Sequence, residues 1–152
     1  MNYILGMAYV VSKLLVHRDL AARNVLLFDN FVAKISDFGL CCSLEEAHQS
    51  TVSKKLPIKW LSIEVLTERC FSEKSDVWAF GVLMYEMFTF GAAPYETMNN
   101  DELVIFLQSG ARLECPTNMN NELCEIMLAC WKKDPTQRPS FIELEQIILS
   151  LK

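Results

Sequence analysis

Two short polar segments carry side chains that could hold a metal ion and move a proton. The first is His17-Arg18-Asp19-Leu20-Ala21-Ala22-Arg23-Asn24, and the second, thirteen residues beyond Asn24, is Asp37-Phe38-Gly39. Carboxylate and amide oxygens suit Mg²⁺, which prefers one or two carboxylates together with substrate phosphates. A remaining carboxylate can accept a proton from a hydroxyl. For either segment alone, the simpler interpretation is a polar turn that closes a hairpin.

The residues between the two segments predict the element that brings them together. The runs Val25 to Phe28 and Phe31 to Ile35 are rich in β-prone residues, and Asp29-Asn30 between them is a hairpin turn signal. Since two hairpin strands return the chain to its starting end, the second polar segment is expected to face the first across a small gap.

Helical patterns on both sides of the hairpin predict a mainly helical fold. Apolar spacing, capping residues and prolines predict helices over residues 2–13, 77–90, 100–110, 123–131 and 140–151. The second of these has almost no polar residue and is expected to be a central helix buried on all sides. Residues 36–56 lack periodicity and are expected to form a long loop, which is usually functional.

Composition excludes several classes of function. The 152 residues, 51% of them hydrophobic, suit one domain or one large lobe. A formal net charge of −5 argues against general binding to nucleic acid or to an anionic membrane surface. We expect no membrane-spanning segment and no secretory signal within the chain. The six cysteines are therefore expected to be thiols in a reducing compartment, with Cys124 and Cys130 as small core residues.

Together, the two polar segments resemble the catalytic signature of the protein kinases. The residues Ala21-Ala22-Arg23-Asn24 and Pro57-Ile58-Lys59-Trp60 are similar to the tyrosine-kinase branch of that family. Further similar stretches are Ser75-Asp76-Val77-Trp78-Ala79-Phe80-Gly81, Cys130-Trp131, Asp134-Pro135 and Arg138-Pro139. The resemblance covers nearly the whole chain. It implies that residues 1–152 are the C-terminal large lobe of a protein kinase domain, mainly α, with a small β-hairpin beside the catalytic loop.

The resemblance also implies roles in catalysis. Asp19 would be the catalytic base, and Arg23 would lie beside the transferred phosphate. Asn24 and Asp37 would hold the Mg²⁺ ions of bound ATP, and Leu26 would touch the adenine.

Other matching residues would support these groups. The implied structural or regulatory set is His17, Arg18, Phe38, Gly39, Glu64, Asp76 and Arg138. Within it, Asp76 would bind backbone amides of the catalytic loop, and Glu64 would pair with Arg138. Pro57 and Trp60 would form a platform for a substrate tyrosine.

Departures from the family pattern limit what is expected of the chain by itself. No G-x-G-x-x-G loop is present and only sixteen residues precede His17, so the small N-terminal lobe is expected to be absent, and half of the ATP site with it. Ser62-Ile63-Glu64 stands where the family usually has Ala-Pro-Glu. Residues 40–56 contain no tyrosine whose phosphate could meet Arg18.

Two functions follow as expectations. The first is a protein tyrosine kinase that uses ATP and Mg²⁺ to phosphorylate tyrosine in a protein substrate, represented here by a catalytic lobe that is inactive alone. The second is a truncated, non-catalytic, kinase-like interaction module. The run from Phe71 to Gly91 is slightly more similar to receptor kinases. A cytoplasmic location is expected, with any attachment to the plasma membrane in a segment outside this chain.

Overall fold

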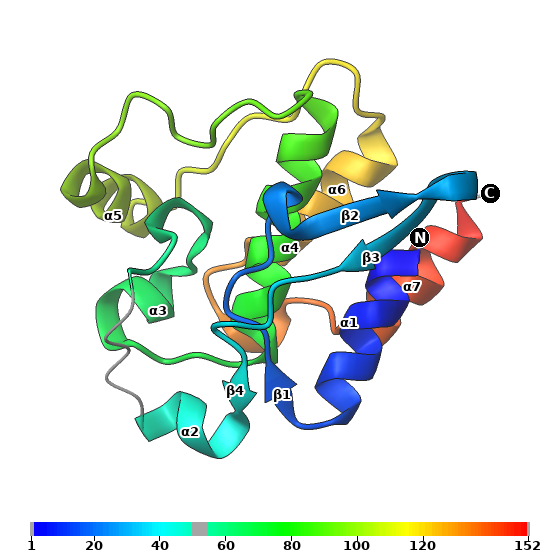
Figure 1. Ribbon diagram of the computed structural model, residues 1–152. Helices are drawn as coiled ribbons and strands as arrows, with labels where there is room; N and C mark the ends of the chain where they lie inside the picture. Colours follow the sequence, from blue (N-terminus) through cyan, green and yellow to red (C-terminus); the bar gives the residue numbers. More distant parts are fainter. Residues whose placement is uncertain (1, 50–54, 152) are drawn as a thin grey trace.

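The computed structural model describes residues 2–49 and 55–151, which form a mainly helical fold with two small antiparallel sheets (Figure 1). The helices are α1 (Asn2–Ser12), α2 (Leu44–Gln49), α3 (Ile63–Glu68), α4 (Glu73–Phe88), α5 (Asn100–Gln108), α6 (Asn121–Cys130) and α7 (Phe141–Ser150). The strands are β1 (Leu15–Val16), β2 (Val25–Phe28), β3 (Val32–Ile35) and β4 (Cys42–Ser43). The predicted fold class is therefore confirmed. None of the described helices is long and apolar enough to cross a membrane.

α4 is the central helix of the core. Ser72 caps its first turn, and Trp78 and Phe80 are fully buried among side chains from the surrounding helices. Figure 1 shows α4 running through the middle of the molecule, with α1, α6 and α7 on one side and α3 and α5 on the other. The expected burial on all sides does not reach the end of the predicted helix, because Met87 is half-exposed and Phe90, beyond α4, is 92% exposed.

The predicted hairpin is present. β2 pairs with β3 in antiparallel register, with Val25 opposite Ile35 and Phe28 opposite Val32. Asn30 in the turn has a left-handed backbone (φ 59°), which asparagine tolerates better than most residues. The hairpin therefore returns the chain to its starting end.

The expectation of a structureless loop over residues 36–56 is wrong for residues 42–49. β4 pairs with β1, with Val16 opposite Cys42, and α2 follows directly. Ala47 of α2 is buried in a small apolar cluster with Val16 and Phe71. The sequence of this segment shows no clear helical or strand periodicity. It is stabilised instead by the pairing of β4 with β1 and by the burial of Ala47. Residues 50–54 lie outside the described residues.

The expectation that all cysteines are thiols is also wrong. Cys115 and Cys124 form a disulfide, with their Cα atoms 5.8 Å apart. A turn closed by the bond from the Met119 amide to the Pro116 carbonyl folds the preceding loop back against α6 and brings the two residues together. Cys130 is fully buried, as expected.

Candidate active site

The loop between β1 and β2 is bound to α4 through Asp76. The Asp76 carboxylate, 1% exposed, accepts hydrogen bonds from the backbone amides of His17 (2.7 Å) and Arg18 (2.9 Å). Burial raises the pKa of Asp76 to about 7, although the two amides favour the ionised form and act in the opposite direction. Asp76 therefore fixes the start of the loop that carries Asp19.

Glu86, two residues before the end of α4, binds the same loop at a second point. Its Oε2 accepts hydrogen bonds from the Ala22 amide (2.9 Å) and from the Trp60 indole (3.0 Å), and the residue is buried. No role is predicted for Glu86 from the sequence, where it is one of the few polar residues in the apolar run 77–90. Its place in that run was the available signal, because a carboxylate on a buried helix needs hydrogen-bond donors.

Asp19 is oriented by two side chains from the following turn. The Arg23 guanidinium is in direct contact with one carboxylate oxygen, and the Asn24 amide nitrogen donates to the other (2.9 Å). Asn24 also donates to the Asp19 carbonyl (2.8 Å). The Arg23 guanidinium lies 4.6 Å above the Trp60 ring, which Glu86 holds in place. These contacts give the Asp19 carboxylate a defined direction on a fixed loop.

Hydrogen bonds at the open end of the hairpin place Asp37 close to Asn24. The amide and the hydroxyl of Ser36 both donate to the Asn24 carbonyl (2.8 and 3.0 Å). Asp37 has a left-handed backbone (φ 58°), a conformation that is strained for a non-glycine residue and is often found at functional sites. Its Oδ1 accepts a bond from the Gly39 amide (3.1 Å), and a Cβ on Gly39 would lie only 3.0 Å from that oxygen.

These residues suit a magnesium ion that takes most of its ligands from a substrate. Asp19 and Asp37 both lie within electrostatic reach of His17, and Asn24 binds the first of them. Among the described residues, no group of three or more His, Cys, Asp or Glu side chains gathers into a metal site. The Asp37 carboxylate and the Asn24 side-chain oxygen would be the small protein share that Mg²⁺ takes beside phosphate oxygens and water, with Asp19 as the remaining carboxylate.

His17 connects the two polar segments. It is fully buried, and its ring contacts Phe38 edge-on with the ring centroids 5.0 Å apart. Burial lowers the pKa of His17 and favours the neutral imidazole. Its Nδ1 accepts a bond from the Asp19 amide (3.3 Å).

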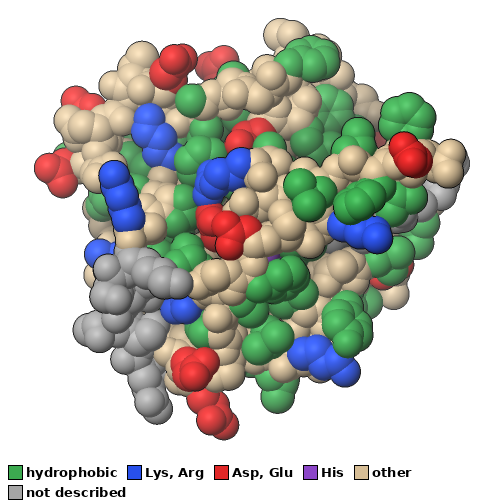
Figure 2. Space-filling view, in the orientation of Figure 1, with side chains coloured by type: hydrophobic (Ala, Val, Ile, Leu, Met, Phe, Trp, Pro, Cys, Tyr) green, Lys and Arg blue, Asp and Glu red, His purple; other side chains and the backbone are tan. Residues whose placement is uncertain are grey.

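An exposed apolar area adjoins this site. Its members, here called the hairpin surface, are Leu26, Leu27, Phe28, Phe31 and Phe38, which are between 49% and 90% exposed. Figure 2 shows hydrophobic side chains gathered on the part of the molecule where the hairpin lies. Leu26, the predicted adenine contact, therefore lies on an open surface.

A hollow lies directly beside the Asp19 carboxylate. It has a volume of about 330 Å³ and is lined by Asp19, Arg23, Leu40, Lys55, Leu56 and Pro57. The structure thus brings Pro57 to the same hollow as Asp19. Trp60 does not line the hollow but lies under Arg23.

Arg18 joins the loop that carries Asp19 to the segment after Gly39. Its Nε donates to the Leu40 carbonyl, and its guanidinium lies 5.3 Å from the centre of the Phe71 ring. Arg18 therefore contacts both Leu40, before residues 50–54 in the sequence, and Phe71, after them.

Glu64 and Arg138 form an ion pair away from the hollow. Two guanidinium nitrogens of Arg138 donate to the two carboxylate oxygens of Glu64 (2.7 and 2.8 Å), and Arg138 is 2% exposed. Arg138 also lies 5.0 Å above the Trp78 ring. The pair connects the start of α3 to the segment before α7 and contacts none of the candidate catalytic residues.

Comparison with known proteins agrees with these features. Residues 2–148 match the family model described as protein tyrosine and serine/threonine kinase. The chain is 45% identical to fibroblast growth factor receptor 1 of Xenopus laevis over 141 residues, which cover 91% of the chain and 17% of the receptor. It is 45% identical to the human tyrosine-protein kinase Srms over 142 residues, 93% of the chain and 29% of that protein. It is 46% identical to a tyrosine-protein kinase of Caenorhabditis elegans over 139 residues, 91% of the chain and 16% of that protein. The chain thus spans less than a third of the length of each relative.

Proposed function

We propose a function from the family to which this chain belongs, that of the protein tyrosine and serine/threonine kinases. Residues 1–152 are the C-terminal lobe of a kinase domain that transfers the γ-phosphoryl group of ATP to a tyrosine of a protein substrate. The domain works in the cytoplasm, where ATP is available. One observation carries the proposal: Asp19, Arg23 and Asn24 are joined side chain to side chain on a loop that Asp76 and Glu86 bind to the core.

In this proposal Asp19 orients the tyrosine hydroxyl and accepts its proton while the hydroxyl oxygen bonds to the γ-phosphorus. The bond between that phosphorus and the β–γ bridging oxygen breaks, and ADP leaves. Arg23, beside Asp19, compensates charge on the transferred group. Asn24 and Asp37 would hold Mg²⁺, which neutralises phosphate charge when bound.

The hollow beside Asp19 supports tyrosine as the acceptor. Pro57 offers an apolar wall, and Asp19 and Arg23 offer polar groups at the same place. A phenol ring can lie against the apolar wall while its hydroxyl reaches the carboxylate. A serine side chain is too short to use both features at once.

The test is a fusion of this chain to the small lobe of a related tyrosine kinase, which supplies the glycine-rich loop and its lysine. We expect Mg²⁺-dependent transfer to a tyrosine peptide, reduced about a hundredfold or more in Asp19→Ala and in Asp37→Ala. Arg18→Ala is the comparison on the same loop and should cost much less, because Arg18 does not line the hollow and residues 40–56 contain no tyrosine whose phosphate it could bind.

The second candidate function is the non-catalytic interaction module. The hairpin surface favours it, because large exposed apolar areas mark sites of association. The same fusion separates the two functions. A fused protein that binds Mg²⁺-ATP but transfers no phosphate supports the interaction module and contradicts the kinase.

A further inference from the structure

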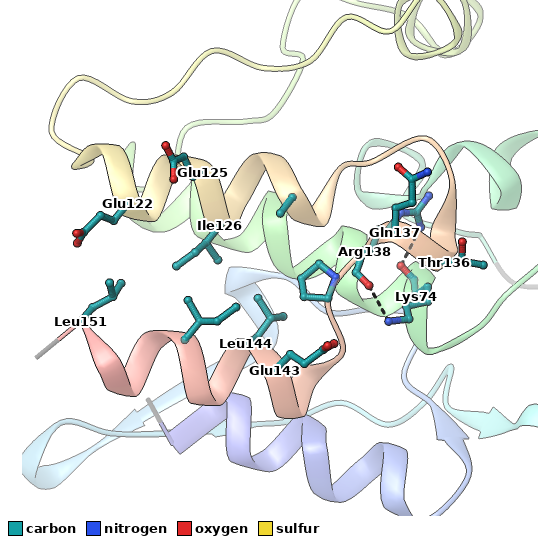
Figure 3. A pocket seen from close by; sticks show the side chains of 13 residues that line it. Lys74, Glu122, Glu125, Ile126, Thr136, Gln137, Arg138, Glu143, Leu144 and Leu151 are labelled. Carbon is teal, nitrogen blue, oxygen red and sulfur yellow. Dashed lines mark hydrogen bonds between the residues drawn. The ribbon is translucent and has the colours of Figure 1, made fainter.

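A groove separates α6 from α7. α6 packs on α4, whereas α7 packs on α1, so the two helices do not cover one another. The hollow between them has a volume of about 780 Å³, within the range of ligand-binding sites. Figure 3 shows Ile126 of α6, Leu144 of α7 and Leu151, just beyond the end of α7, directed into this space. We call it the α6–α7 groove.

The floor of the α6–α7 groove is apolar. Ile126 and Leu144 line the groove from the main core, where Ile126 is 7% exposed and Leu144 is fully buried. Ile147, farther along α7, also lines the groove and is 41% exposed. Apolar area of this kind is stabilised when a second apolar surface covers it.

The rim of the groove is acidic. Glu122 and Glu125 on α6 are exposed, and neither forms an ion pair with any residue in the described ranges. Glu143 on α7 also lines the groove, and hydrogen bonds from Ser140 lower its pKa and keep it ionised.

Few positive charges balance these three carboxylates. Lys74 lines the groove, where its ammonium donates to the Arg138 carbonyl (2.7 Å; Figure 3). Arg138 itself is buried and paired with Glu64. Three carboxylates therefore face one ammonium, and the electrostatic potential of the rim favours a positively charged occupant.

We propose that the α6–α7 groove binds a short basic, amphipathic helix of a partner protein. Each wall is a helix of ten residues, which is about 15 Å long, so two to three turns of a third helix fit alongside. Leucine-like side chains at positions i, i+3, i+4 and i+7 of the partner cover Ile126 and Ile147, as in other helix-in-groove complexes. Its Lys or Arg side chains lie against Glu122 and Glu125. An acidic helix of the same shape is repelled.

The probe for this proposal is a fluorescent helical peptide of leucine and lysine with leucine at those positions, and fluorescence anisotropy measures its affinity for the chain. Ile147→Asp should weaken binding by about tenfold or more, because a carboxylate in an apolar contact is costly. Ile142→Asp is the matched control. Ile142 is on the same helix, is 58% exposed and does not line the groove, so the affinity should stay within about twofold.

The charge of the rim is tested separately. In the Glu122→Lys/Glu125→Lys variant, the lysine peptide should bind about tenfold more weakly at low salt, and a peptide with glutamate in place of lysine should bind better. Glu68→Lys/Glu114→Lys gives the same change in net charge at exposed positions outside the groove and should leave both affinities nearly unchanged.

Three outcomes overturn the proposal. One is the absence of binding to the parent chain. Another is equal affinity of the parent for the lysine and glutamate peptides. The third is equal affinity of the parent and the groove variants for the lysine peptide, which places binding elsewhere, for example on the hairpin surface.

Discussion

The loop that carries Asp19, proposed to be the catalytic loop, and the segment that follows the hairpin are held to the molecule in different ways. Asp76 and Glu86 bind the backbone of the catalytic loop from inside the core. Beyond the hairpin, the contacts are more exposed: the Asp37 carboxylate accepts a hydrogen bond from the Gly39 amide, and Phe38, half-exposed, contacts His17. The difference indicates that the chain by itself fixes the loop that carries Asp19, the proposed base. The hairpin surface beside Asp37 is exposed among the described residues, so we expect the orientation of Asp37, the proposed metal ligand, to become fixed only when another surface covers it.

The largest expected effect concerns the kinase activity of the chain when nothing covers the hairpin surface. The 152-residue chain alone should transfer no phosphate above background to a poly-Glu/Tyr substrate, because phosphoryl transfer depends on positioning and charge stabilisation from both sides of the ATP. The measurement is incorporation of labelled phosphate. If the chain alone transfers phosphate and this activity disappears in Asp19→Asn, phosphoryl transfer does not require another surface over the hairpin.

The anchor under the catalytic loop should contribute strongly to stability. Asp76→Ala leaves the amides of His17 and Arg18 without their acceptor and opens a cavity, so the free energy of unfolding should fall by about 2–4 kcal/mol. Urea unfolding measures this change. A loss below about 0.5 kcal/mol would mean that the loop does not depend on this anchor.

The same anchor should make stability depend on pH. The ordinary pKa of aspartate is 3.8, and that of buried Asp76 is about 7, so between these values the folded state holds more protons than the unfolded state. Relative to Asp76→Asn, the parent should therefore lose stability as pH rises from about 4 to 7, by at most about 1.4 kcal/mol per pH unit. Arg18 and Glu73 are the charged neighbours and are the same in both proteins. A difference that is independent of pH would mean that the two amides outweigh burial.

The smallest effect is expected on the hairpin side. Phe38→Ala should lower the free energy of unfolding by less than about 1 kcal/mol, because half of the ring is already in water. Urea unfolding beside Asp76→Ala gives the comparison directly. If the Phe38 variant is the less stable of the two, the contrast between the regions is wrong.

Local patterns predicted the hairpin and most helices, because strand propensity, turn residues and caps act over a few residues. Distant contacts could not be predicted in this way. Glu86 binds Ala22 across 64 positions and Trp60 across 26, and nothing beside Glu86 in the sequence indicates those partners.

The elements missed between residues 42 and 49 have the same explanation. Strand β4 exists because β1 lies alongside it, and α2 because Ala47 meets a cluster built from distant residues. The Cys115–Cys124 disulfide depends on the turn that precedes α6, which spacing alone does not reveal. By contrast, the polar segments themselves were recognisable, since their residue types and order carry the family resemblance.

The most direct test of the proposed function is the initial rate of the fused protein on two peptides that differ only in carrying tyrosine or serine. We predict Mg²⁺-dependent transfer to the tyrosine peptide, little transfer to the serine peptide, and a loss of about a hundredfold or more in Asp19→Asn. A fused protein that binds Mg²⁺-ATP and phosphorylates neither peptide, or whose Asp19→Asn variant is as fast as the parent, contradicts the proposal that Asp19 is the base of a tyrosine kinase.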